Sequence, residues 1–412
     1  MELMYDLHAL PTSQHRAGLA GLVLLMRIMQ RLRMPDIPEI EVAGPGVRLV
    51  LEEQHLVTLF NFLYDASTEE RRVRRPRRRD GVVVEPLRID LESIADEGGD
   101  SQEKEWYVYP QVAPRAAFLR DLGMPDIWLK LWRDVVWTTL RGVPQTRLPF
   151  EQRARGSDAA EGHALWKDLQ KWEKTRNTAR PFRVSLAGCI YVGAMATNSE
   201  DVPFRDTPER VLLLHCWQAV MGVGEVRRLV VKNGELKEES AGYVITVPDV
   251  LDLDGFCSEF EASVAQLRPE PAGYRPRDGV LALPFEGGLQ YLLSLTSARA
   301  SPGHVRFTLA GVDVFCLRKQ GNTIPILAAG RVPAELSLVE QYALIRGQYG
   351  NLLFREQLVR NLLRERPWYE GFDRLFSLHD TERFIGSNAR GFPVSAARRL
   401  RADAASEGGT DD

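Results

Sequence analysis

The longest apolar run of the chain, AGLAGLVLLM from Ala17 to Met26, most restricts what the chain can fold into. Capping and proline signals predict a helix around it, from about residue 12 to about residue 33. The run is shorter than the ~20 residues that cross a membrane, so it predicts a helix buried in a protein core. Gly18 and Gly21 lie one turn apart in it. Because glycine weakens a helix, their placement predicts that another backbone packs closely there.

The composition is that of a soluble globular protein. The chain has 412 residues, of which 44% are hydrophobic and 26% charged, and is long enough for two or three domains. Its net charge of -3 means that nucleic-acid binding must depend on local charge. The four cysteines are far apart and lie mostly in apolar runs, which excludes paired CxxC zinc motifs and indicates reduced thiols in a cytoplasmic protein.

A second core unit is predicted from Ser185 to Trp217. An apolar segment rich in small residues leads through a polar turn, residues 197–201, into a helix that Asp206 or Thr207 can cap. Apolar segments on both sides of a short turn indicate core that presents this turn at its edge.

The rest of the chain has sequence patterns of both helices and β-hairpins. Tryptophan-rich helices are predicted over 126–142 and 163–180, with a loop between them, and a strand before a helix over 47–64. A hairpin around residues 233–234, a helix from residue 255 and a three-stranded meander over 304–332, turning near Gly311 and residues 320–322, follow. We therefore expect an α+β fold: a mixed body with antiparallel hairpins over 1–332, a helical region over 333–401 and a disordered tail over 402–412.

The sharpest charge feature is RRVRRPRRR, residues 71–79. Pro76 and the lack of an apolar period predict a loop, and residues 90–105 are a second, acidic loop. The basic run is either a solvated loop or a clamp for phosphates. Its seven candidate ligands are Arg71, Arg72, Arg74, Arg75, Arg77, Arg78 and Arg79.

A row of basic residues lies on the second tryptophan helix, opposite its apolar side. The row consists of Lys167, Lys171 and Lys174, and Arg176 and Arg180 extend it. It is either an ordinary solvated face or a surface that follows a nucleic-acid backbone. The polar residues Gln14 and Asn198 are further candidates for contact with RNA or with base edges.

No motif for catalysis, metal or cofactor binding has adequate context. Asp252, Asp254 and Glu261 match part of an EF-hand loop, but Val250 occupies its first ligand position, so helix capping by Asp249 or Asp254 is favoured. We expect no catalytic residue, metal or cofactor. Two alternatives remain open: a metal-dependent nuclease that uses His15, His215 or Asp252, and a stand-alone DNA-binding regulator.

Several strings prompt comparison with a known family. LPTSQHRAGLAGLVLL, IYVGAMATNSEDVPF, LLLHCWQAV, YVITVPDVLDLDGFCSEF and FPVSAARRLRADA resemble the large subunit of the type I CRISPR Cascade surveillance complex. The similarity is to the Myxan-subtype branch of the Cas-eight family. It is spread over most of the chain and rests on consensus strings rather than on catalytic motifs.

The resemblance implies a non-catalytic subunit that serves antiviral defence. Such a subunit lies near the 5′ handle of the CRISPR RNA (crRNA), contacts the PAM-proximal part of the double-stranded target DNA and helps to open it. It also provides a platform for the helicase-nuclease, beside backbone, handle-binding and small subunits. Base pairing then reads the sequence, while protein reads the adjacent motif and the backbone. This chain ends soon after its second C-terminal helix, so we expect a shortened bundle or a separate small subunit.

Overall fold

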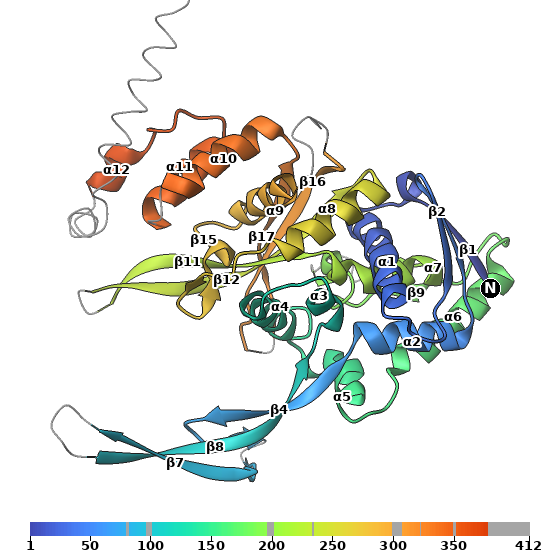
Figure 1. The fold of residues 1–412 in the computed structure, drawn as a ribbon, viewed down its shortest axis with the longest axis horizontal. Coiled ribbons are helices and arrows are strands. Elements are labelled where there is room, and N and C mark those ends of the chain that lie inside the picture. The colour runs from blue at the N-terminus through green and yellow to red at the C-terminus, as the bar shows by residue number, and fades with distance from the viewer. Residues whose placement is uncertain are drawn as a thin grey trace, which may run out of the picture.

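The computed structural model describes residues 1–79, 82–95, 101–195, 202–232, 235–298, 307–321, 323–348 and 352–377. Helices and mostly antiparallel sheets combine in an α+β body from which one β-sheet projects as an arm (Figure 1). The predicted fold class is therefore confirmed, and helices end the described chain as expected. The predicted tail lies outside the described residues.

A five-stranded sheet forms the centre of the body, in the order β15-β11-β12-β16-β17. Its strands are β11 (Gly222–Lys232), β12 (Glu235–Val250), β15 (Val280–Leu281), β16 (Leu309–Leu317) and β17 (Ile326–Pro333). The predicted hairpin is β11 and β12. The three-stranded meander is wrong: Gly311 lies within β16 opposite Pro333 instead of in a turn. The segment supplies two strands, which extend the sheet from β12.

Helix α1 (Ser13–Arg31) is the predicted apolar helix and is buried along most of its length. It crosses α7 (Pro208–Cys216), the helix of the second core unit. A Cβ atom added at Gly18 would collide with the Leu213 carbonyl oxygen, and one at Gly21 with that of Cys216. The predicted close approach of a second backbone is thus confirmed. No helix within the described ranges is long and apolar enough to cross a membrane.

Helices and a small sheet surround this crossing. The sheet β1-β3-β2 consists of β1 (Glu2–Asp6), β2 (Glu39–Ala43) and β3 (Gly46–Val50). The helices are α2 (Glu53–Leu63), α3 (Ala117–Asp121), α4 (Asp126–Thr138), α5 (Leu148–Ala154) and α6 (Ala160–Thr175). The predicted loop between the tryptophan helices is partly wrong, because α5 forms there and buries Phe150. All four cysteines are free and buried, as predicted.

Helices α8 (Leu253–Ala265) and α9 (Glu286–Ser297) lie side by side, and the C-terminal helices follow them (Figure 1). The C-terminal helices are α10 (Leu336–Gln348), which lies against α9, α11 (Leu352–Leu363), which lies against β11, and α12 (Phe372–Phe376). Asp252 caps α8 by accepting a hydrogen bond from Gly255 N at 3.1 Å, so the predicted caps at Asp249 and Asp254 are wrong. Asp249 instead pairs with Arg16 and Arg331.

The arm is a three-stranded sheet of order β4-β8-β7. Its strands are β4 (Ala66–Val73), β7 (Arg88–Ala95) and β8 (Ser101–Pro114), and a small hairpin of β5 (Arg78–Arg79) and β6 (Val82–Val83) joins β4 to β7. The predicted loop over 71–79 is therefore confirmed only for residues 74–77, since 71–73 and 78–79 are strand, and the predicted loop over 90–105 is strand in its described residues, 90–95 and 101–105. The pattern concealed β4 because most of it faces water, without the apolar alternation of a strand with one buried face.

Candidate nucleic-acid interface

One face of the arm carries charges that neutralise one another. Arg72 on β4 pairs with Asp90 on β7 at 2.7 Å. Arg88 contacts both Glu70, at 2.6 Å, and Asp90, at 2.9 Å. Two arginines thus face two carboxylates, so Arg72 is occupied within the sheet instead of being available to a phosphate.

The opposite face of the arm carries arginines with neutral partners. Arg71 donates to Gln111 Oε1 at 2.9 Å. The guanidinium carbon of Arg77 lies 4.9 Å from the centre of the Tyr109 ring, and Arg77 Nη2 donates to the same Gln111 oxygen at 3.4 Å. No carboxylate in the described part of the chain pairs with either guanidinium. Burial and the nearby Arg71 lower the pKa of Arg77 from its usual value, so an anion placed here would relieve repulsion between two cations.

These two arginines line a cavity of about 660 Å³ at the root of the arm. Arg147 and Lys319 line it from the body, together with Trp137, and Glu151 is the single carboxylate in the lining. Arg147 is held by hydrogen bonds to the carbonyl oxygens of Arg141, at 2.7 Å, and Trp137, at 3.1 Å. Four cations against one anion make this an anion-attracting cavity, which we call the arm-root cavity.

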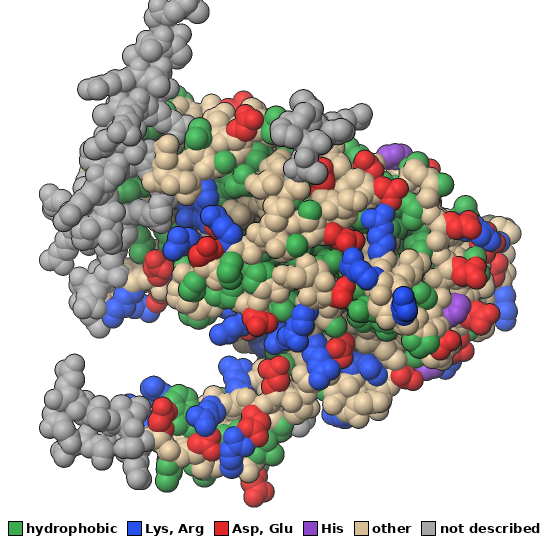
Figure 2. All heavy atoms as spheres, in the orientation of Figure 1, with side chains coloured by type: hydrophobic (Ala, Val, Ile, Leu, Met, Phe, Trp, Pro, Cys, Tyr) green, Lys and Arg blue, Asp and Glu red, His purple; other side chains and the backbone are tan. Residues whose placement is uncertain are grey.

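A second cavity of about 510 Å³ lies next to it and shares Arg71, Gln111 and Trp137. Lys130 and Arg133 from α4 line it, but so do Glu69, Glu70 and Asp134, so its charge is balanced. Figure 2 shows the deep hollow between arm and body, with Lys and Arg side chains gathered on the body side of it. The arm-root cavity is therefore the more basic of the two.

The rest of the arginine run lies in other environments. The guanidinium carbon of Arg74 lies 5.2 Å from the centre of the Trp106 ring, and Arg75 and Arg78 are exposed. Arg79 belongs to β5, but its side chain lies outside what the structure describes. The seven arginines are thus not one clamp, because only Arg71 and Arg77 line the arm-root cavity.

The lysine row lies on α6, at the opposite end of the body from the arm (Figure 1). Lys167, Lys171 and Lys174 are exposed, as are Arg176 and Arg180. Lys171 pairs with Asp168 at 2.9 Å, and Arg176 pairs with Glu173 at 3.3 Å. The row and the arginine run therefore do not form one continuous basic surface.

Of the two polar residues expected to contact RNA or base edges, the structure describes only Gln14. Gln14 is buried in α1, with 3% of its surface exposed, so it cannot reach RNA in this structure, and that prediction is corrected. Gln14 is buried because other elements of the body pack against nearly all sides of α1. Asn198 lies outside the described residues.

The two histidines that the sequence offered for catalysis form hydrogen bonds to other side chains of the fold. His15 bonds to Thr12 Oγ1 at 2.7 Å and to Asp206 Oδ2 at 2.9 Å. His215 Nδ1 lies 2.6 Å from the Tyr64 hydroxyl, and burial lowers the pKa of His215 to about 3. No group of three metal-ligating side chains occurs in the described ranges. These contacts give the nuclease alternative no support.

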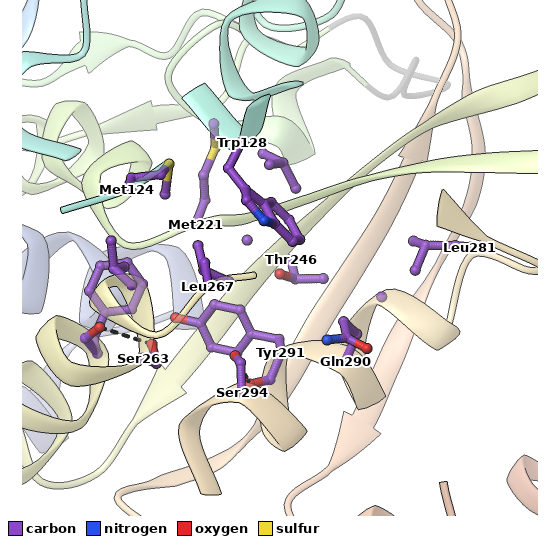
Figure 3. Close-up of a pocket in the computed structure, with 15 residues that line it drawn as sticks. Met124, Trp128, Met221, Thr246, Ser263, Leu267, Leu281, Gln290, Tyr291 and Ser294 are labelled. Atoms are coloured by element: carbon purple, nitrogen blue, oxygen red, sulfur yellow. Dashed lines mark hydrogen bonds between the residues drawn. The ribbon is translucent and has the colours of Figure 1, made fainter. Parts of the chain in front are cut away.

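A third cavity lies inside the body, between α8, α9 and the central sheet (Figure 3). Its volume is about 60 Å³, and Met124, Trp128 and Tyr291 lie around it. No charged side chain lines it. It is too small for a nucleotide, since ligand pockets usually measure ~300 Å³ or more.

The sequence did not reveal Arg147 and Lys319 as members of the site. They lie far from residues 71–77 along the chain, in segments with no basic run. Arg147 directly precedes α5, which packs on β4 and β8, and Lys319 follows the end of β16, so tertiary folding brings both to the cavity.

Two family models together match most of the chain. Residues 37–303 match the model of the type I-B CRISPR Cas8b N-terminal domain, and residues 309–410 match that of the Cas8b C-terminal domain. The class is therefore that of the large subunit of a type I CRISPR system. The chain belongs to the Cas8b family of type I-B, which is generally a non-catalytic subunit of Cascade. No curated protein matches the chain.

Proposed function

We propose that this chain is the subunit of its Cascade complex that holds the PAM-proximal target duplex at the arm-root cavity. The observation that carries the proposal is the convergence of Arg71, Arg77, Arg147 and Lys319 on one cavity. Each phosphate that such cations neutralise releases counterions, which favours binding in a salt-dependent way.

The contacts of these cations are with uncharged groups, which leaves their positive charge available to phosphates. The amide oxygen of Gln111 and the ring of Tyr109 orient Arg71 and Arg77 without cancelling their charge. Trp137 and backbone carbonyl groups do the same for Arg147, whose guanidinium carbon lies 4.5 Å from the centre of the Trp137 ring. Side chains that are already oriented lose less conformational entropy when a phosphate binds.

The further roles follow from membership of the family and are part of the proposal. They are contact with the crRNA near its 5′ handle, help in opening the duplex, and recruitment of the helicase-nuclease for antiviral defence in the cytoplasm. The neighbouring subunits are the backbone, handle-binding and small subunits. The Myxan-subtype branch, the division of the chain at 332/333 and a role for the α6 row also stay predictions.

The test uses Cascade assembled with full-length variants. Arg71→Gln with Arg77→Gln removes two cations from the arm-root cavity and is expected to weaken binding of a PAM-containing duplex at least tenfold. The matched control is Arg72→Gln with Arg88→Gln, on the face where arginines pair with carboxylates. Equal affinity of the cavity variant and the wild type would overturn the proposal.

A further inference from the structure

Exposed apolar side chains are concentrated on the arm between residues 82 and 91. Six of the 17 large hydrophobic residues exposed in the described chain lie there, with 38% to 70% of their surface exposed. They are Val82, Val83, Val84, Leu87, Ile89 and Leu91, which we call the arm patch. A cluster of this kind on a soluble protein usually marks an interaction site.

Register places Ile89 and Leu91 of the arm patch on one face of the arm. Ile89 is opposite Tyr107 and Leu91 is opposite Glu105, so both side chains point to the same face as Tyr107 and Tyr109. The Tyr109 hydroxyl accepts a hydrogen bond from Arg77 N at 3.0 Å and donates one to Val84 O at 3.1 Å. The ends of the β5–β6 hairpin are therefore held to this face at Tyr109.

The charges at the Ile89–Leu91 end of the arm patch disfavour a nucleic acid as its occupant. Glu105 is exposed directly opposite Leu91, and Glu85 is exposed next to Val84; the exposed Arg78 lies in the hairpin, opposite Val83. Phosphates would be repelled by these carboxylates and would gain nothing from aliphatic side chains. A protein segment with apolar residues and nearby lysines or arginines would satisfy both features.

Strand β7 also offers a backbone for such a segment. It is at the edge of the arm in the order β4-β8-β7, and no strand in the described ranges pairs with its outer side (Figure 1). A free edge with alternating exposed apolar residues is a template for addition of another strand.

We propose that the arm patch and the β7 edge dock an extended segment of a neighbouring protein subunit, in which apolar residues alternate and basic residues flank them. Six side chains are fewer than the ~20 that each side of a stable interface usually contributes. The contact is therefore one part of a larger assembly and should be tested there. Its test does not depend on DNA binding at the arm-root cavity, because it uses the complex without target DNA.

The experiment places a photoreactive amino acid at position 91 of the full chain and irradiates the assembled complex without target DNA. Mass spectrometry of the products is expected to show a crosslink to another subunit, at a peptide with alternating apolar residues and adjacent Lys or Arg. Crosslinks to crRNA alone, to a second copy of this chain, or to no other molecule would each overturn the proposal.

A substitution that keeps strand propensity provides a second measurement. Ile89→Thr with Leu91→Thr is expected to increase dissociation of this chain from the DNA-free complex at least tenfold on dilution, and to leave the thermal unfolding of the free chain unchanged. Leu327→Thr is the matched control, because Leu327 is an exposed residue of the edge strand β17. Equal dissociation of the arm-patch variant and the control would contradict a docking role.

Discussion

Arg77 and Tyr109 are joined twice: the Arg77 backbone N–H donates to the Tyr109 hydroxyl at 3.0 Å, and the guanidinium carbon of Arg77 lies 4.9 Å from the centre of the ring. The same hydroxyl donates to Val84 O at 3.1 Å. One side chain of β8 therefore fixes both ends of the β5–β6 hairpin and orients a cation of the arm-root cavity.

Tyr109→Phe removes only the hydroxyl, so it is expected to loosen the hairpin while the ring still contacts Arg77. Removing these bonds should cost ~1 kcal/mol locally and speed amide hydrogen exchange of residues 77–79 and 82–84. Tyr107→Phe is the control, because the Tyr107 hydroxyl donates to Glu105, at 2.6 Å, instead of to the hairpin. Equal exchange rates in the two variants would show that Tyr109 does not hold the hairpin.

Glu286→Gln is expected to loosen the C-terminal helices α10 and α11 from α9. Arg355 Nε lies 3.0 Å from Glu286 Oε1, and Arg346 Nη1 lies 3.4 Å from the same atom. All three side chains are buried, so the substitution leaves Arg355 without a carboxylate partner in the described chain, while Arg346 keeps Asp278 at 3.4 Å. We expect the free energy of unfolding in urea to fall by about 3 kcal/mol.

The control for Glu286→Gln is Glu356→Gln. Glu356 pairs with Arg360 on the more exposed side of α11, where an ion pair contributes ~0.5 kcal/mol. Similar urea midpoints for the two variants would contradict the assigned role of Glu286.

Gly18→Ala is expected to destabilise the chain although alanine favours helices. The helix preference gives at most ~1 kcal/mol, whereas the collision of the new methyl group with the Leu213 carbonyl group costs ~1–3 kcal/mol. Gly347→Ala in α10 is the control, because no atom lies within 4 Å of a Cβ there. Thermal unfolding should show a lower Tm for Gly18→Ala and an equal or higher Tm for Gly347→Ala. A raised Tm in both would contradict the close crossing of α1 and α7.

His215 is expected to make stability depend on pH. Burial, and secondarily the positive charge of Arg141, lower the pKa of His215 to about 3 in the folded chain, against ~6.5 when unfolded. Between these values the unfolded chain binds a proton that the folded chain does not. The free energy of unfolding therefore falls as the pH decreases from about 6.5 towards 3.

His215→Gln removes this proton-binding group, so Tm should vary less steeply with pH between 6.5 and 4 than in the wild type. The same substitution at exposed His8 is the control and should preserve the wild-type slope. An unchanged slope in His215→Gln would refute the assignment.

The sequence predicted elements whose pattern reflects burial. Helix α1 and its glycines were predicted because apolar residues continue through several turns and only a close neighbour explains two glycines there. The β11–β12 hairpin was predicted from its alternation and its turn residues.

The arm was missed for the opposite reason. Its strands are exposed over much of their surface, so RRVRRPRRR resembles a loop, although residues 71–73 pair with β8. The arm-root cavity could be predicted only in part, since Arg147 and Lys319 reach it through tertiary packing. A local sequence pattern does not show which distant segments come into contact in the folded chain.

The central claim is that Arg71 and Arg77 bind target phosphates, and the salt dependence of duplex binding tests it most directly. The association constant of assembled Cascade for a PAM-containing duplex should be measured from low to physiological salt, for the wild type and for Arg71→Gln with Arg77→Gln. The slope of log K against log salt is expected to become shallower by ~0.9 for each phosphate that the variant no longer neutralises, or by ~1.8 if each arginine neutralises one phosphate. A variant with the affinity and the slope of the wild type would contradict the account.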